Sequence, residues 1–338
     1  MPAPQQTKLN TIMKRNILMV MVAAAGITAW GAAPKVGELS NVRRLTSELS
    51  MKYENPRFSP DGSRVSFTEF GYDGLYVINA DGTGLLKLTS EPGVGFCYQW
   101  NAEGSEILVR GTRKADVATE GAPRMHFVAR VDVAGKGIER VGQEAANMLP
   151  PVWRYNGGSA SVTTGQGLVK TAARNGRKLN LPAGVTIESL QSVPMFRTSF
   201  QSDSEHLYAI GAEGVARSIY DGGAFCAQLS PDGKRVAFCT DLDEIKVMNI
   251  DGSNVVTLGK GFAPAWVNDG QLIVERTTDD GHIYKSGELF LVNIATAQFK
   301  AITATPGRIE MNACVSPDGS KLLFTDFNDG QVYIADLK

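Results

Sequence analysis

Histidine and cysteine are scarce in this sequence, and the common catalytic motifs are missing. The 338 residues include three histidines and four cysteines, with no Cys-x-x-Cys and no group of cysteine with histidine. Zinc sites use such spacings, so no metal site is expected. Gly-x-Ser-x-Gly, the Walker loop, Gly-x-Gly-x-x-Gly and His-Glu-x-x-His are also absent. No motif therefore supplies a catalytic residue, and no cofactor is expected.

Neither sign of charge dominates the chain. The 34 lysines and arginines nearly balance the 35 aspartates and glutamates, which gives a formal net charge of −1. Such a balance provides no general attraction to nucleic acid or to anionic membranes. A composition of 43% apolar and 20% charged residues suits an ordinary soluble globular protein.

Long apolar runs are missing except near the N-terminus. The run from Ile17 to Trp30 is uncharged and mostly apolar, with basic residues before it and small residues after it. This order is typical of a secretory signal peptide, here residues 1–33, with cleavage after Gly31. The run is too short to span a bilayer comfortably, and no cysteine at the cleavage site would carry a lipid. The mature protein, residues 34–338, is expected to be periplasmic or secreted without a transmembrane segment.

A recurring five-residue pattern is the strongest feature that is present. It reads Phe58-Ser-Pro-Asp-Gly, Leu229-Ser-Pro-Asp-Gly and Val315-Ser-Pro-Asp-Gly, and an alternating apolar run follows each copy. Proline sets the first corner of such a turn, aspartate bonds the local backbone, and glycine takes the positive φ that closes the hairpin. Short strands that repeat every 40-odd residues predict an all-β fold, a β-propeller of four-stranded blades.

The number of blades follows from the residue that precedes each turn. Seven such residues are found, of which two precede degraded copies of the turn: Phe58, Trp100, Trp153, Phe200, Leu229, Trp266 and Val315. Seven blades are therefore favoured, with six as the alternative. The C-terminal run Gln331–Leu337 reads as a third strand with no fourth after it, and the segment Val42–Ser47 resembles a fourth strand. We expect this N-terminal strand to complete the last blade and close the ring.

The turns and the run Leu75-Tyr-Val-Ile-Asn-Ala-Asp-Gly resemble the WD40-like (PD40) repeats of the TolB propeller family. The resemblance covers roughly Val42 to Lys338, so it concerns the propeller portion only. It implies an extracytoplasmic propeller that binds other proteins. It does not single out an activity, because propellers with unrelated functions share this repeat.

The cysteines leave one pairing open. Cys226 and Cys239 fall opposite each other if the hairpin between them is regular, and a disulfide is then geometrically plausible. A bulge in the hairpin would shift the register by one residue and separate them. Cys97 and Cys314 are assigned to blades that are not neighbours, so free thiols are expected there.

Recognition is expected on one face of the disc. Loops between the second and third strands, and the connections between blades, share this face and carry the variation in length. One long loop, Gly111–Arg124, holds Arg113, Lys114 and Arg124, and Leu181–Pro194 is a third candidate. The other long loop, Thr277–Gly287, holds four polar or aromatic candidates: Asp279, Asp280, His282 and Tyr284.

The innermost strand of each blade begins at this same face. Asn55, Arg197 and Asn312 are expected to stand at the mouth of the central channel, where they could hold a carboxylate of a ligand or a peptide end.

Two functions remain open. A binding module of the cell envelope is favoured, acting as a monomer on a protein or peptide, or on a small-molecule or saccharide ligand, and not on nucleic acid. The rival is a propeller lyase or hydrolase of polysaccharides, with Arg197 and His282 as candidates at the channel mouth.

Overall fold

The computed structural model describes residues 39–48, 50–113, 124–146, 148, 150–153, 160–164, 167–170, 199–202, 206–210 and 216–338. The segment 1–33, the connection Leu181–Pro194, Lys114 and Arg197 lie outside these residues. All regular elements among the described residues are β-strands. None of the described residues forms a helix long and apolar enough to cross a membrane.

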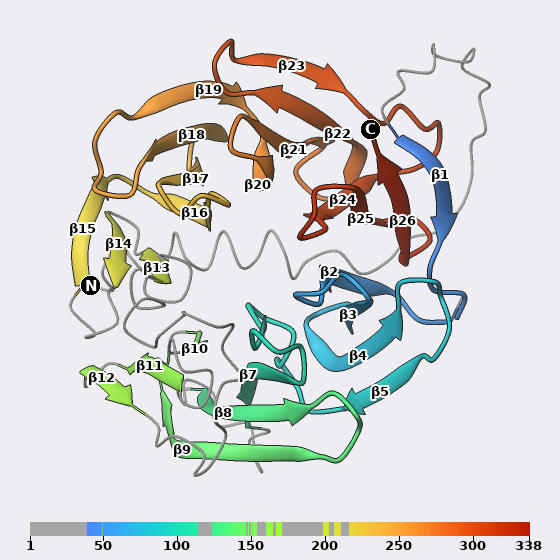
Figure 1. Ribbon diagram of the computed structural model, residues 1–338, viewed down its shortest axis with the longest axis vertical. Helices are drawn as coiled ribbons and strands as arrows, with labels where there is room; N and C mark the ends of the chain where they lie inside the picture. Colours follow the sequence, from blue (N-terminus) through green and yellow to red (C-terminus); the bar gives the residue numbers. More distant parts are fainter. Residues whose placement is uncertain are drawn as a thin grey trace, which may run out of the picture.

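Five four-stranded antiparallel sheets make up most of the described chain. Figure 1 shows them arranged around a common axis, with the first strands β2, β16, β20 and β24 on the inner side of their sheets. In chain order, the first two sheets are β2 (Tyr53–Phe58), β3 (Arg64–Glu69), β4 (Asp73–Asn79), β5 (Leu86–Thr89), and β6 (Gln99–Trp100), β7 (Glu106–Thr112), β8 (Met125–Asp132), β9 (Ile138–Ala146). The next are β16 (Ala224–Leu229), β17 (Arg235–Thr240), β18 (Glu244–Asn249), β19 (Val256–Lys260), and β20 (Phe262–Asn268), β21 (Gln271–Asp279), β22 (Tyr284–Asn293), β23 (Gln298–Ala301). The last sheet contains β24 (Glu310–Val315), β25 (Lys321–Asp326), β26 (Gln331–Leu337) and the N-terminal strand β1 (Leu39–Arg44).

Two further sheets have three strands each in the described residues. They are β10 (Val152–Trp153), β11 (Ala160–Thr164), β12 (Gly167–Lys170), and β13 (Ser199–Ser202), β14 (His206–Ile210), β15 (Ala216–Asp221). The expectation of seven four-stranded blades is therefore wrong for the described chain, which has five. The first strands of the two smaller sheets contain Trp153 and Phe200, after which the turn sequence is degraded and the signals for a complete blade are weakest.

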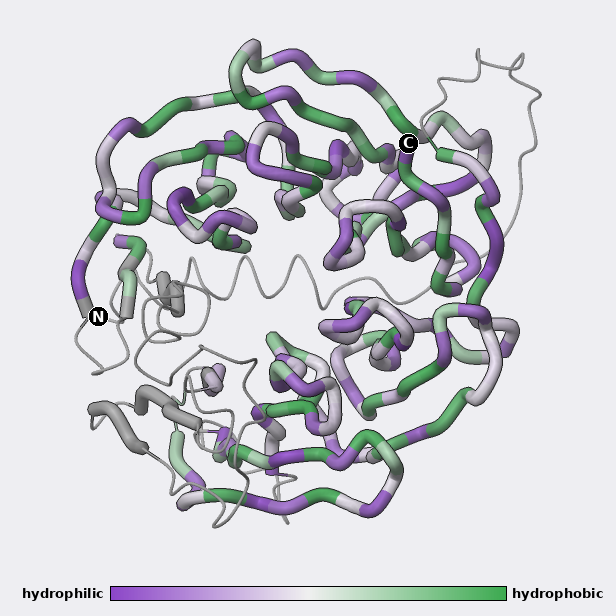
Figure 2. The backbone as a smooth tube through the Cα atoms, viewed as in Figure 1, coloured by the Kyte–Doolittle hydropathy of each residue, from purple (hydrophilic) through white to green (hydrophobic). Residues whose placement is uncertain are grey.

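Hydrophobic residues fill the spaces between successive sheets. One cluster joins Val77 on β4 to Ile107 on β7, and another joins Phe67 on β3 to Val332 on β26. Figure 2 shows the hydrophobic stretches in the strands, with hydrophilic residues at many of the turns. Burial of these faces against each other, at roughly 25 cal/mol per Å² of apolar surface, is the main stabilising contribution expected for such stacked sheets. The apolar–polar alternation of the sequence thus fixes which side of each strand is buried.

The repeated turn satisfies its own polar groups. In the first copy, the Ser59 hydroxyl donates to the Asp61 carboxylate over 2.6 Å, and the backbone amides of Gly62 and Arg64 are bonded to Ser59. The Ser59 hydroxyl and the Ser63 groups hold the pKa of Asp61 at about 2. The copies at Ser230 and Ser316 repeat the same serine–aspartate bond at 2.6 Å. The serine and aspartate that recur in the repeat therefore stabilise the local backbone of the turn.

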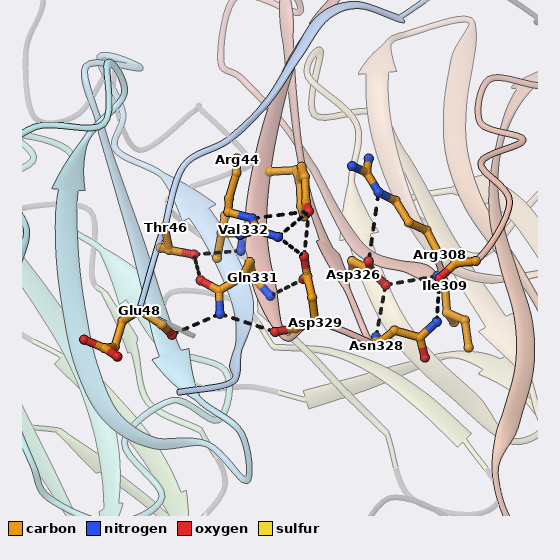
Figure 3. Close-up of polar contacts among 12 residues, drawn as sticks. Arg44, Thr46, Glu48, Arg308, Ile309, Asp326, Asn328, Asp329, Gln331 and Val332 are labelled. Atoms are coloured by element: carbon orange, nitrogen blue, oxygen red, sulfur yellow. Dashed lines mark hydrogen bonds and ion pairs between the residues drawn. The ribbon is translucent and has the colours of Figure 1, made fainter. Parts of the chain in front are cut away.

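Strand β1 is the outermost strand of the last sheet, as the sequence predicted. It pairs antiparallel with β26, with Leu39 opposite Leu337 and Arg44 opposite Tyr333. The completely buried Gln331 secures the following residues: it accepts from the Thr46 hydroxyl over 2.9 Å and donates to the carbonyls of Glu48 and Met51. Figure 3 shows this network beside the Arg44–Asp329 ion pair of 2.6 Å.

Candidate functional site near the axis

The innermost strands share a backbone irregularity at the position expected to line the channel mouth. Five non-glycine residues there have φ between +45° and +57°: Asn55, Cys97, Cys226, Ala263 and Asn312. In four of these sheets the pairing with the second strand shifts at this point, which marks a β-bulge. We call these five residues the axial ring. Bulges of this kind bend a strand and re-aim side chains, so the ring is a built feature of the fold.

The two asparagines of the axial ring bond within the scaffold. The Asn55 amide donates to the Gly95 carbonyl over 2.7 Å, and the Asn312 amide donates to the Thr325 hydroxyl over 2.9 Å. Asparagine also tolerates a positive φ better than most residues. Both residues therefore have a structural role at the expected mouth, while the third candidate there, Arg197, lies outside the described residues.

Second-strand side chains support the bulges from behind. Thr68, Thr325 and Cys239 each donate to the carbonyl that precedes the ring residue of their own sheet, at 3.2–3.4 Å. Glu275 occupies the corresponding position on β21 and bonds instead to the next sheet, where it accepts from the Ala313 amide over 3.2 Å. Its side chain is buried, and this burial raises the pKa of the carboxyl to about 7.

The bulge also decides the position of the cysteines. Cys239 lies opposite Phe225, and the register shifts between Phe225 and Gln228, so the regular pairing of Cys226 with Cys239 was wrong. No disulfide links any of the four cysteines in the structure. A hydrogen bond with Cys239 raises the pKa of Cys226, and burial adds to the rise. The two thiols are thus close without being cross-strand partners, and the disulfide stays a prediction.

The long loop of the second sheet is described only at its ends. Arg113 forms an ion pair with Glu144 over 3.1 Å, and Arg140 pairs with the same carboxylate over 3.0 Å. Thr89, Glu91 and these arginines line a shallow pocket of about 430 Å³. Arg124 is exposed at the other end of the loop. The arginine charges in this pocket are thus partly balanced by glutamates.

The Thr277–Gly287 loop uses its aspartates for its own backbone. Asp279 accepts from the Gly281 amide, and Asp280 accepts from the amides of His282 and Ile283. Asp280 also pairs with Lys285 over 2.9 Å, and this contact lowers the pKa of the carboxyl. The Asp280 carboxylate thus accepts from the backbone amide of His282, a candidate of the lyase or hydrolase reading.

Tyr284 belongs to a group of aromatic rings on the same face. Its ring lies 5.5 Å from that of Phe327, which lies 6.3 Å from that of Phe70. We call these three residues, from three neighbouring sheets, the aromatic ledge. Large apolar side chains stand exposed at the same kind of loop elsewhere: Phe70 is 38%, Leu242 64% and Ile283 43% exposed. Sequence reasoning missed Phe70 and Leu242, although their place in second-to-third-strand loops could have revealed them.

Two further carboxyl groups at this end of the strands are protonated more readily than usual. Burial raises the pKa of Glu54, which accepts from the amides of Gly71 and Tyr72, to about 7. Burial and the neighbouring Glu288 raise the pKa of Glu310 to about 8. Glu310 is fully buried, and a hydrogen bond with the side chain of Thr305 offsets only part of this rise. Within the described ranges, no group of three or more His, Cys, Asp and Glu side chains is arranged to hold a metal.

Sequence relatives match parts of the chain. A stretch of 118 residues, 32% of this chain, is 29% identical to the protein TolB homolog of Chlorobium luteolum and covers 26% of it. A stretch of 45 residues, 13% of this chain, is 47% identical to the Tol-Pal system protein TolB of Anaeromyxobacter dehalogenans and covers 10% of it. The chain thus spans about a quarter or less of these curated relatives. No family model matches the sequence.

A solved structure shows the same architecture. The β-propeller domain of Cps50 (Swd1) from Myceliophteria thermophila superposes with a TM-score of 0.59, over 88% of this chain and 100% of that one. The two sequences are 12% identical, so this likeness concerns the fold alone. The chain thus has a β-propeller fold, and parts of its sequence are similar to TolB proteins.

Proposed function

We propose that this TolB-like propeller is an exported scaffold that binds a protein or peptide partner in the cell envelope. It binds through the face that carries the second-to-third-strand loops, which we call the loop face. The signal-like residues 1–33 support export to the periplasm or the exterior. The pairing of β1 with the last sheet supports a closed ring that presents this face rigidly.

Exposed apolar loop tips carry this proposal. Phe70, Leu242 and Ile283 come from three different sheets, yet each stands at the same kind of loop with more than a third of its surface exposed. Among the described residues, the other large exposed apolar side chains lie in outer strands or beside the turns that lead to them: Val42, Leu85, Leu86, Val255 and Val256. Exposed apolar patches on soluble proteins commonly mark interaction sites, and aromatic residues are enriched in them.

The test compares two sets of substitutions of equal chemistry. A loop-face variant carries Phe70→Ser, Leu242→Ser and Ile283→Ser, and a control carries Leu85→Ser, Val255→Ser and Val256→Ser. Each protein is immobilised beside the wild type in an envelope extract, and the retained proteins are quantified by mass spectrometry. We expect a partner that the wild type and the control retain and the loop-face variant loses. Identical profiles from all three proteins would contradict binding through the loop face.

A further inference from the structure

Arg57 places a positive charge near the axis. It lies on β2, two residues after Asn55, and its field reaches thiols of three other sheets, Cys97, Cys226 and Cys314. Cys97 lies just before β6, Cys226 lies on β16 and Cys314 on β24, so all three thiols come from the innermost part of their sheets. The guanidinium stacks on the Tyr98 ring at 5.3 Å. Its Nε is buried without a hydrogen-bond partner.

Arg110 brings a second guanidinium to the same place. It lies on β7 and stacks on the Phe96 ring at 4.8 Å. One terminal nitrogen donates to the Met148 carbonyl over 2.7 Å, while its Nε is buried without a partner, as in Arg57. Burial lowers the pKa of Arg110, which reflects the cost of holding its charge there. Burial raises the pKa of Cys97, and both arginines oppose that rise, so the thiol lies within the field of the two cations.

The counter-charge of this pair is not supplied by the described residues. Across those ranges, neither Arg57 nor Arg110 takes part in an ion pair, whereas Arg44 pairs with Asp329 and Arg113 with Glu144. Half-buried charges without a partner are costly, and a bound anion would relieve that cost. Guanidinium groups present parallel N–H donors that match the two oxygens of a carboxylate.

We propose that Arg57 and Arg110 form a carboxylate-binding site beside Cys97, at the junction of the first two sheets near the axis. The carboxylate comes from an acidic side chain or C-terminus of a bound peptide, or from a free small molecule. The terminal nitrogens that have no partner among the described residues donate to it, while Phe96 and Tyr98 cover one side of each guanidinium. None of the three loop tips of the proposed partner surface contributes to the site, so each proposal can fail without the other.

Alkylation of Cys97 tests the site with a probe that carries its own carboxylate. In the full-length protein, rates at Cys97 are measured by peptide mass spectrometry with iodoacetate and with iodoacetamide, which is neutral and of similar size. In both reactions the thiolate sulfur displaces iodide from carbon, and the thiol proton goes to the buffer. N-acetylcysteine in the same tube gives the intrinsic ratio of the two rates. We expect the iodoacetate-to-iodoacetamide ratio at Cys97 to exceed that reference about tenfold.

Matched variants assign the preference to the arginines. Arg57→Gln should reduce the ratio toward that of N-acetylcysteine, and Arg57→Lys should keep part of the excess because the charge remains. Arg64→Gln, which removes an arginine stacked on Trp100 at the other end of the same sheet, should change nothing. A circular dichroism melt verifies that each variant is folded. Should Arg57→Gln fail to fold, the lysine variant and the competition below decide the question.

Competition distinguishes the two sources of the carboxylate. Succinate, an acidic peptide and the same peptide with amidated carboxyl groups are each added before iodoacetamide. Protection of Cys97 by the acidic peptide and not by its amide supports a peptide carboxylate, and protection by succinate alone supports a small molecule. The proposal is overturned if Cys97 shows no iodoacetate preference, if the preference survives Arg57→Gln, if no carboxylate protects the thiol, or if Cys97 reacts with neither reagent.

Discussion

The two faces of this propeller use polar residues in opposite ways. On the face of the Ser-Pro-Asp-Gly turns, which we call the turn face, each serine and aspartate repeats the same bonds from sheet to sheet, and Asp61 and Asp318 have pKa values held at about 2. On the loop face, Glu54, Glu275 and Glu310 have raised pKa values because burial outweighs their hydrogen bonds. Polar residues that repeat from sheet to sheet thus build the fold, whereas polar residues that do not repeat are available for other roles.

A substitution at Gly252 should give the largest difference in stability between the two faces. Its φ of +91° lies in a turn of the turn face, and a Cβ there would come within 2.6 Å of the Ile219 carbonyl oxygen. Gly281, on the loop face, has a φ of +87° with open space around it. We expect Gly252→Ala to lower the free energy of unfolding by about 3 kcal/mol and Gly281→Ala by about 1 kcal/mol, because only the first adds a clash to the strain. Urea denaturation of both variants measures the difference, and equal losses would contradict it.

Glu310 should make the loop face sensitive to alkaline conditions. Its folded-state pKa of about 8 exceeds the ordinary value of 4.5, so between these pH values the folded protein binds more protons than the unfolded chain. Stability should therefore fall as pH rises through this window. Glu310→Gln should reduce the fall between pH 5 and pH 8 by about 2 kcal/mol. Urea titrations across the window test this, with Glu139→Gln, on an exposed part of β9, as the control.

Asp318 should give the turn face the opposite dependence on pH. Its carboxylate accepts from Ser316 and Ser320, and these bonds hold its pKa at about 2, below the ordinary 3.8. Its contribution is therefore present above about pH 4 and lost as the pH falls through 2. Asp318→Ala should cost on the order of 1 kcal/mol at pH 7, limited by solvent screening, and less at pH 2. A cost that does not shrink in acid would show that the charge is unimportant.

A substitution at Ala263 should have the smallest effect on stability, and it tests whether the backbone of the axial ring is strained. It holds a φ of +45° where Asn55 and Asn312 stand in two other sheets. Asparagine tolerates this backbone region better than alanine, so Ala263→Asn should raise the free energy of unfolding by about 0.5 kcal/mol. A matched Ala227→Asn, in the innermost strand of the preceding sheet but outside the positive-φ set, should not stabilise the protein. Thermal melts of both variants resolve the comparison.

Much of the fold could be predicted because turn chemistry and alternation are local. The Ser-Pro-Asp-Gly hairpins identified the propeller, and the similarity of Val42–Ser47 to a fourth strand identified the partner of β26. The bulges could not be placed, because a one-residue shift leaves no clear trace in the apolar pattern; this misplaced Cys226 relative to Cys239. The sequence analysis also missed that Arg57 lies close to thiols of other sheets. This proximity depends on how the sheets pack around the axis, which a sequence pattern does not reveal.

The pairing of β1 with β26 also sets an order of events. Asn41 and Asp336 are bonded across 295 positions of sequence, so the last sheet cannot be completed until β26 is available to pair with β1. Closing so long a loop carries an entropic cost before its contacts form, and topologies rich in such contacts fold slowly. Until then the edge of β26 stays open, and the nascent chain depends on its N-terminal segment remaining available rather than pairing early elsewhere.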